Sequence, residues 1–481
     1  MNQRTLGAAF MAAALPLSCE TASELPPRNA GINVLLITVD TLRADHLSAY
    51  GYPRQTSPAI DALAARGVTF EKTFTYWPKT RASFASIFTS LYASQHGLTV
   101  RDRDLPDFND TLAETLQRAG YRTAAAVDNG NLDARLGFAQ GFDEYEQTWL
   151  TGATEIERTE QITRFGEVFL AREGDERPFF LWLHYVNPHT PYEPPSELLD
   201  RFRDDGLVPR GPELEPVVGY HGGVNRHETI EGARWGDYVD RYDAEILLAD
   251  SHVGRVLEAL AASAHPSTTL VVFTSDHGES LGEHDYFFDH GHDLFNPSLR
   301  IPLIVSFPGF LPSGERVVAA VSTLDIFPTI LDLAQVNFPP GLEGRSVLPL
   351  VRGTATRLHD QLFFQNDQHL TAISNGRLKL VYYPGLQGQP ERCELYDMYR
   401  DPSEEADRYR DAEKRLAPLV AELGSFHTRT VAWQQATSSK RSPAVEDIEL
   451  PASTRDSLIE LGYIEEPEPR EEIKPSALRC P

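Results

Sequence analysis

Short apolar runs alternate with helical patterns through most of the chain. Apolar runs that are rich in β-branched residues and end in polar residues are typical of strands buried on both faces of a sheet. Such runs occupy Ile32–Val39, Tyr121–Val127, Pro178–Val186, Leu270–Phe273 and Ile301–Val305, where Pro302 indicates an edge strand or a strand start. Helix signals occupy Ser57–Ala65, Asp110–Ala119, Tyr238–Leu260 and Asp325–Ala334. This alternation predicts an α/β fold with a doubly wound, mostly parallel sheet.

The pattern changes beyond about Thr354, where short alternating runs replace the long buried ones. The runs 370–374 and 378–383 flank Asn375–Gly376, a strong hairpin signal because both residues tolerate positive φ. The pattern that follows predicts a helix over 404–426 and a loop over 437–447. These features predict a smaller C-terminal α+β subdomain that contains an antiparallel sheet.

The domain organisation follows from these changes of pattern. We expect a signal segment over residues 1–18, a large domain over 30–353, the C-terminal subdomain over 354–465 and an acidic tail over 466–481.

Charged side chains follow two of the predicted strands. Asp40 ends the first run, and Asp276 and His277 come directly after the strand that contains Leu270–Phe273. In open α/β sheets, groups just past the carboxyl ends of strands face the ligand crevice. Two carboxylates and an imidazole form a set of metal ligands, although a lone Asp-His pair more often belongs to a solvated loop. The mixed oxygen and nitrogen set favours manganese or zinc and also admits calcium or magnesium.

Thr80 falls at or just before a predicted helix N-terminus, between Lys79 and Arg81. Free amide groups and the helix dipole favour an anion at that place. A Thr there ordinarily caps the helix. A metal bound by Asp40, Asp276 and His277 offers a second role, because it could activate a neighbouring hydroxyl as a nucleophile.

The balance of charge narrows the choice of partners. The chain has 44 basic and 70 acidic residues, a net charge of −26, and no basic cluster. This argues against nucleic acid and against an anionic membrane surface as partners. A small anionic ester would have to be held by a metal or by a few local cations.

The first 18 residues have the length and apolar character of an export signal rather than of a membrane span. Leu15–Cys19 resembles a bacterial lipoprotein cleavage box, although Pro16 fits that pattern poorly. We expect contact with a membrane only if a lipid anchor forms at Cys19. We expect a periplasmic, cell-envelope or extracellular protein. Cys393 and Cys480 could pair there or stay apart.

Several of these stretches together resemble the sulfatase family of the alkaline phosphatase superfamily. The resemblance rests on Asn33–Tyr52, Thr80–Tyr92, Pro188–Tyr192 and Thr274–Pro308, and it continues through Glu394–Asp397, Asp401–Pro402 and Leu461–Tyr463. It implies a divalent metal beside a nucleophile that attacks sulfate or phosphate esters. Asp40, Asp276 and His277 match metal ligands, and Thr80 matches the nucleophile.

The resemblance also implies candidate substrate-binding residues. His189 and His292 match positions that hold the anionic oxygens of the substrate or protonate the leaving group. Asn129 lies near another such position, and Lys79 and Arg81 flank the nucleophile.

The chain departs from the family pattern at the nucleophile. Sulfatases that form formylglycine carry C-x-P-S-R or S-x-P-S-R, whereas this chain has Thr80–Phe84, and Thr41 replaces the second Asp of an Asp-Asp pair. Thr cannot yield the formylglycine aldehyde. Phosphoethanolamine and glycerol-phosphate transferases of the superfamily use a Thr nucleophile with an Asp-His pair, which matches Asp276–His277.

The resemblance therefore implies a metal-dependent hydrolase that prefers phosphoesters or phosphonoesters. Two alternatives are a conventional sulfuric ester hydrolase and a non-catalytic relative that binds anions. A structural protein of the cell surface is a third, which explains none of the ligands at the strand ends.

Overall fold

A computed structural model of the chain describes residues 31–98, 104–203, 205–217, 223–225, 229–367, 369–385, 390–412, 416–440 and 452–460. The expected signal segment, Cys19, Cys480 and the acidic tail lie outside the described residues. Within the described ranges, none of the helices combines the length and the apolar character that a membrane span requires.

A central sheet forms the middle layer of the molecule. Its strands are β1 (Asn33–Val39), β2 (Val68–Phe74), β3 (Arg122–Val127), β4 (Glu144–Gln147), β5 (Phe179–Tyr185), β8 (Thr269–Ser275), β11 (Arg300–Ile301), β12 (Leu303–Ser306) and β13 (Glu315–Ser322). They are ordered β11-β2-β12-β8-β1-β5-β3-β4, with β13 paired to β2. The run from β8 to β4 is parallel, whereas β12 is antiparallel to both β2 and β8. The predicted mostly parallel α/β sheet is confirmed.

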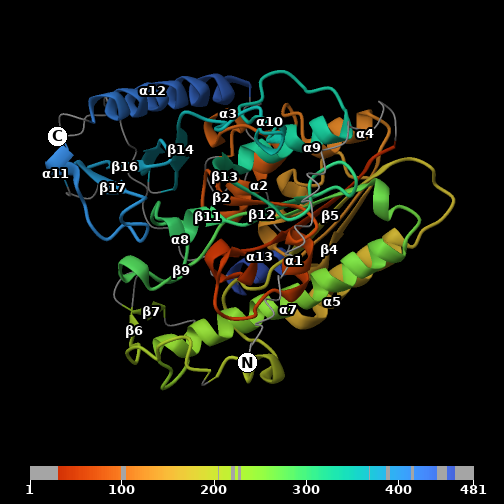
Figure 1. Cartoon of the computed structure of the whole chain (residues 1–481), viewed down its shortest axis with the longest axis horizontal. Coiled ribbons are helices and arrows are strands. Elements are labelled where there is room, and N and C mark those ends of the chain that lie inside the picture. Colours follow the sequence, from red (N-terminus) through yellow and green to blue (C-terminus); the bar gives the residue numbers. More distant parts are fainter. Residues whose placement is uncertain are drawn as a thin grey trace, which may run out of the picture.

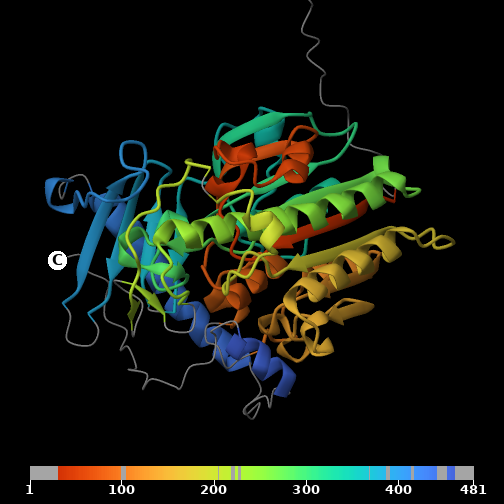
Figure 2. The same ribbon diagram turned by 90° about the horizontal axis from the view of Figure 1, so that it is seen from below.

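Helices cover both faces of this sheet (Figure 1). One face carries α2 (Thr80–Thr89), α3 (Ala93–His96), α4 (Leu112–Arg118), α9 (Ile326–Ala334) and α10 (Leu348–Val351). The other carries α1 (Pro58–Ala64), α5 (Glu155–Leu170) and α7 (Trp235–Ala262), and Figure 2 looks onto α5 and α7. In β1, Val34 and Leu36 pack toward the first layer while Leu35 and Ile37 pack toward the second. Both faces are buried, which explains the unbroken apolar runs.

The C-terminal subdomain contains a four-stranded antiparallel sheet at one end of the molecule (Figure 1). Its strands are β14 (Leu362–Gln365), β15 (Thr371–Ser374), β16 (Leu378–Tyr383) and β17 (Arg392–Asp397). The hairpin predicted at Asn375–Gly376 joins β15 to β16. The helices that follow are α11 (Tyr409–Ala412), α12 (Ala417–Lys440) and α13 (Ala452–Glu460).

Several short elements join the layers. They are the helices α6 (Ser196–Leu199) and α8 (Asn296–Leu299), the pair β6 (Pro216–Val217) and β7 (Val224–Asn225), and the pair β9 (Ser280–Leu281) and β10 (Phe287–Asp289).

The structure differs from the sequence-based expectation in the C-terminal helix and in two strands. The expected helix over 404–426 is not helical over 404–408, and α12 runs from Ala417 to Lys440. The expected loop over 437–447 is therefore wrong at its start, where the Thr437 hydroxyl donates to the Ser94 carbonyl in α3. Strands β2 and β13 contain charged residues and lack the buried run that marks the other strands.

Pro302 lies directly before β12, which agrees with the expected strand start.

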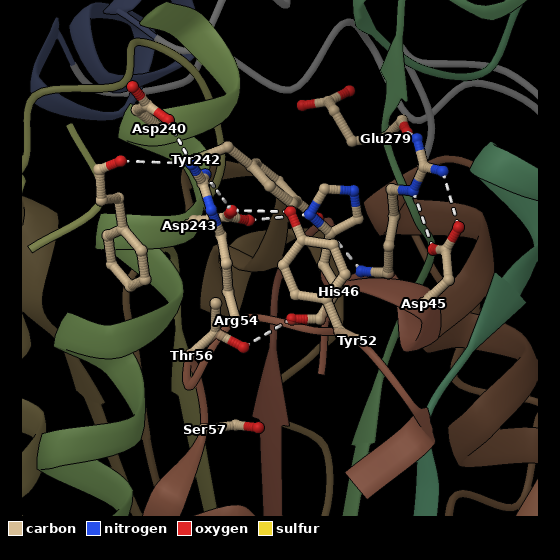
Figure 3. Close-up of polar contacts among 12 residues, drawn as sticks. Asp45, His46, Tyr52, Arg54, Thr56, Ser57, Asp240, Tyr242, Asp243 and Glu279 are labelled. Atoms are coloured by element: carbon tan, nitrogen blue, oxygen red, sulfur yellow. Dashed lines mark hydrogen bonds and ion pairs between the residues drawn. The ribbon is translucent and has the colours of Figure 1, made fainter. Parts of the chain in front are cut away.

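A buried charge cluster fixes the loop between β1 and α1 to helix α7 (Figure 3). The Arg54 guanidinium donates to Asp240 and to Asp243, both at 2.7 Å, and also to Asp205. Asp243 in addition accepts from Tyr52 at 2.7 Å. The loop that follows Asp40 is therefore held by several charge-assisted hydrogen bonds rather than by apolar packing alone.

Replacing Arg54 should destabilise the fold strongly. The Arg54 side chain is 1% exposed, so Arg54→Met leaves Asp240 and Asp243 buried without its positive charge. We expect the free energy of unfolding to fall by about 3–5 kcal/mol in urea denaturation. Arg316→Met is the control: its side chain is 45% exposed and pairs with Glu71, so a loss below about 1 kcal/mol is expected. Equal losses in both variants would contradict this account of Arg54.

Candidate active site

Neighbouring parallel strands deliver the candidate ligands to one edge of the sheet. Strands β8, β1, β5 and β3 lie side by side, and Val39 is in register with both Ser275 and Tyr185. Asp40 directly follows β1 and Asp276 directly follows β8, so the two residues lie side by side at the same edge of the sheet. The sequence-based expectation that these strand ends meet agrees with this register.

Asp40, Asp276 and His277 lie together and are fully buried. One ligand atom from each lies within 4.8 Å of the others, a spacing that one cation spans with bonds of about 2.0–2.6 Å. The Nδ1 atom of His277 donates to the Gly278 carbonyl at 3.0 Å, so its Nε2 atom carries the lone pair. That atom lies 3.3 Å from Asp276 Oδ2 and 3.7 Å from Asp40 Oδ1. This is the tautomer that a metal-ligating imidazole needs.

The electrostatics of this cluster fit a cation. Asp40 Oδ1 and Asp276 Oδ2 are buried and have no hydrogen-bond partner among the described residues. Burial raises the pKa of Asp40 to about 7, and burial together with the charge of Asp40 holds the pKa of Asp276 well above its ordinary value. Burial also lowers the pKa of His277 well below its usual range. Two carboxylates cannot both stay ionised here without positive charge, which a divalent cation would supply.

Thr80 is the first residue of α2, and its hydroxyl points to the same cluster. Its Oγ1 atom donates to His277 Nε2 at 3.2 Å, and the residue is fully buried. The N-cap position belongs to Lys79, not to Thr80. Ser83, one turn later, donates to the Asp276 carbonyl at 2.7 Å and so ties α2 to the end of β8. The Thr80 hydroxyl therefore faces the candidate ligands at a helix N-terminus, where an anion is favoured.

Two histidines from separate loops border this cluster. His189 is buried, donates from Nδ1 to the Thr190 carbonyl at 2.6 Å, and has its pKa lowered by burial to about 4. His290 is 3% exposed, and its ring centroid lies 4.2 Å from that of His277 and 5.1 Å from that of His189. His292 is half-buried, with its ring 5.6 Å from that of Tyr286. The residue with a ring contact to His277 is thus His290, which the sequence analysis did not select.

The other candidates from the sequence lie around the cluster. Asn129, just past β3, donates to Asp40 Oδ2 at 2.6 Å. The charge of Lys79 contributes to lowering the pKa of His189, His277 and His290, which places its ammonium near the histidines. Arg81 is half-buried and donates to Asn131 Oδ1 at 3.1 Å.

The sequence analysis also missed His184, which lies inside β5 rather than after it. Its Nε2 atom lies 3.5 Å from Asp40 Oδ2, and its Nδ1 atom lies 3.0 Å from the Thr38 hydroxyl. Burial lowers its pKa to about 4. Its placement depends on the pairing of β5 with β1, which local periodicity does not reveal.

Thr41 replaces the second carboxylate of the family pattern and is strained. It is fully buried with φ +52°, and its hydroxyl has no hydrogen-bond partner among the described residues. A β-branched residue in the left-handed region costs on the order of 1–3 kcal/mol. Tyr242 donates to its carbonyl at 2.7 Å, which helps to hold this conformation beside Asp40.

Comparison with known proteins agrees with this arrangement. The family model named Sulfatase matches residues 32–336, and the model of the C-terminal region of N-sulphoglucosamine sulphohydrolase matches residues 282–426. The chain belongs to the sulfatase family. The family assignment also confirms the expected class of enzyme, a hydrolase that acts on ester bonds.

Individual relatives have low sequence identity to this chain, but the similarity covers most of both chains. The arylsulfatase of Clostridium perfringens is 26% identical over 77% of this chain and 89% of its own length. The multifunctional alkaline phosphatase superfamily protein PehA of Trinickia caryophylli is 26% identical over 77% of this chain and 90% of its own. The solved phosphonate monoester hydrolase of Agrobacterium radiobacter has a TM-score of 0.67 at 22% identity, covering 84% of this chain and 96% of that one. This last likeness establishes the shared fold.

Metal binding at this cluster should depend on pH. Because the pKa of Asp40 is about 7, the empty cluster holds at least one proton at lower pH, and a cation must displace it. We expect the Kd for Mn²⁺ or Zn²⁺ to fall as the pH rises through about 7, by about tenfold per pH unit for each displaced proton. Titration calorimetry at several pH values measures this. Asp276→Asn should abolish the binding; a pH-independent Kd, or metal retained by that variant, would contradict the site.

Proposed function

We propose that the protein is a metal-dependent hydrolase in which Thr80 attacks the phosphorus of a phosphoester or phosphonoester. The observation that carries this proposal is the 3.2 Å hydrogen bond from Thr80 Oγ1 to His277 Nε2, made beside Asp40 and Asp276. A hydroxyl used only to cap a helix would turn back to its own helix amides. This one is directed into the candidate metal cluster, where a bound cation could activate it.

Asp40, Asp276 and His277 would hold the divalent cation, for which manganese and zinc are the preferred identities and calcium and magnesium remain alternatives. When bound, the cation would offset the two carboxylates and stabilise the alkoxide form of Thr80. The unpartnered oxygens of Asp40 and Asp276 support this assignment.

The reaction on this chain has two steps. In the first, Thr80 Oγ1 gives up its proton to the solvent and forms a bond to phosphorus, the bond from phosphorus to the leaving oxygen breaks, and that oxygen receives a proton, for which protonated His292 is our candidate donor. In the second, a water molecule loses a proton and attacks the same phosphorus, the bond to Thr80 Oγ1 breaks, and Thr80 takes up a proton from the solvent. His189 suits the role of base for this water because its lowered pKa keeps it neutral near pH 7 and its Nε2 carries the lone pair.

Positive charge near Thr80 supports an anionic substrate. Lys79 lies close enough to three buried histidines to affect their pKa values, and Arg81 follows Thr80 directly. Asn129, which already binds Asp40, is a further candidate contact. These local cations act against the net charge of −26.

The identity of the nucleophile favours phosphorus over sulfur. A sulfate ester on an aldehyde hydrate can be released by elimination from carbon, but an ester on Thr80 has no such exit. Water must attack the central atom, which phosphoryl groups support under metal-ion catalysis. A conventional sulfatase mechanism would need a residue that can become formylglycine, and Thr80 cannot.

The metal-loaded protein should hydrolyse aryl phosphomonoesters, phosphodiesters or phosphonoesters faster than the matched aryl sulfates. Thr80→Ala should lower kcat/KM by several orders of magnitude, of the order seen when a covalent nucleophile is removed. Rates for the substrate panel, measured with each metal in turn, give the comparison.

A matched control lies on the same helix. Thr89 is also buried, but its hydroxyl donates to the Ala85 carbonyl at 2.7 Å, so Thr89→Ala should keep the wild-type rates. Faster turnover of sulfates, or wild-type rates in Thr80→Ala, would overturn the assignment. A protein that binds these anions without turning them over would be the non-catalytic relative.

We further propose that the protein is exported. Cys393, in β17, is disulfide-bonded, and disulfides persist in oxidising compartments. The apolar first 18 residues agree with this, and Cys19 is the candidate site of a lipid anchor.

Mass spectrometry of protein extracted from membranes should find a mature terminus that begins at an acylated Cys19. Cys19→Ser should release the protein from the membrane fraction without changing its rates. A terminus at another residue, or an unmodified Cys19, would rule out the anchor.

A further inference from the structure

Glu279 is a fully buried carboxylate three residues after Asp276, and it contacts three loops of the site. Its Oε1 atom accepts from His290 Nδ1 at 3.0 Å, and its Oε2 atom accepts from the Tyr192 hydroxyl at 3.3 Å. Its backbone carbonyl accepts from Arg43 at 3.1 Å. The Arg43 guanidinium also donates to Asp45, at 2.8 Å. One residue just past β8 thus touches the loops that follow β1, β5 and β10.

The imidazole that Glu279 binds is itself held firmly in the site. Tyr286 donates to the His290 carbonyl at 3.0 Å. Gly291 has φ +90°, and a Cβ atom there would lie 2.2 Å from Lys79 Cε, so the loop can pass this close to Lys79 only with glycine. The ring of His290 packs against those of His277 and His189. Because His290 packs against His277, which accepts the hydrogen bond from Thr80, the orientation of the His290 ring can affect the reaction.

We propose that Glu279 is a positioning residue that acts through His290. Glu279 accepts through both carboxylate oxygens, from Tyr192 and from His290, so the Nδ1 atom of His290 carries the proton and Nε2 is the acceptor nitrogen of the neutral ring. Without Glu279 the ring could flip or change tautomer. This inference rests on the proposed function, because it sets which nitrogen of His290 can accept a hydrogen bond beside His277 and His189, the residues to which that function assigns roles.

A solely structural role explains the contacts less well. A buried carboxylate costs free energy unless it is hydrogen-bonded, and an apolar residue of similar size would join the loops at lower cost. The contact to a nitrogen of an imidazole that packs against His277 is the feature that only a positioning role requires. Partners of this kind typically change activity by about 10- to 100-fold when removed.

Kinetics of Glu279→Gln test the proposal. We expect kcat for the preferred ester to fall by about 10- to 100-fold with little change in KM. Glu283→Gln is the matched control, since Glu283 lies in the same loop and binds Arg43 at 2.7 Å rather than a histidine; it should keep the wild-type kcat.

A double-mutant cycle tests whether the effect of Glu279 on kcat depends on His290. If Glu279 acts through His290, adding Glu279→Gln to His290→Gln should cause no further loss. An unchanged kcat in Glu279→Gln, or a full further loss in the double variant, would overturn the proposal.

The tautomer of His290 gives a readout independent of activity. In metal-free, ¹⁵N-histidine-labelled wild-type protein, the nitrogen shifts should place the proton of His290 on Nδ1, and His290→Gln identifies the signal. Glu279→Gln should draw the two shifts together, because an amide both donates and accepts. A wild-type proton on Nε2 would overturn the proposal even if the variant failed to fold. Wild-type protein that hydrolyses no ester would refute the proposed function, while this measurement would still decide whether Glu279 orients His290.

Discussion

The repulsion between two buried carboxylates dominates this structure. Asp40 and Asp276 follow adjacent parallel strands in matched register, so the sheet itself forces them together in a space from which water is excluded. In such surroundings like charges raise each other's pKa, and the neutral or metal-bound form is favoured. The neighbouring groups fit this constraint: Asn129 donates to one carboxylate, and His277 presents a lone pair rather than a proton. The cluster is thus suited to a cation before any comparison with other proteins is made.

The loops around this cluster are fixed by polar contacts more than by apolar ones. Arg54 fastens the loop after β1 to α7, and Ser83 fastens the start of α2 to the end of β8. Glu279 connects the loops that carry His189 and His290. Charge-assisted bonds are directional, so they set positions more closely than apolar packing does. A site that needs a hydroxyl, two carboxylates and several imidazoles at defined distances benefits from such anchors.

The departures from the formylglycine pattern are consistent with one another. Thr80 cannot form an aldehyde, and Thr41 stands where the family pattern has a further carboxylate beside the candidate metal cluster. His277 supplies nitrogen where relatives often supply an amide. A site with less negative charge and a plain hydroxyl suits a covalent ester that water must cleave at its central atom. Membership of the sulfatase family therefore accounts for the fold of the chain. The residues that depart from the family pattern, Thr80, Thr41 and His277, support the phosphorus chemistry proposed above.

The sequence by itself determined the parts that depend on local pattern. Unbroken apolar runs identified β1, β3, β5 and β8, and the polar residues at their ends identified Asp40, Asp276 and His277, because parallel strands present their carboxyl ends at one edge. Only the tertiary structure decided which strands are neighbours. His184 is buried inside β5 and meets Asp40 through the order β1-β5, while Glu279 and His290 meet through a loop that folds back on itself. The contact of His184 with Asp40 joins residues far apart in the chain, and that of Glu279 with His290 joins residues 11 positions apart, whereas hydrophobic periodicity reports only on the nearest turns of a helix or pleats of a strand.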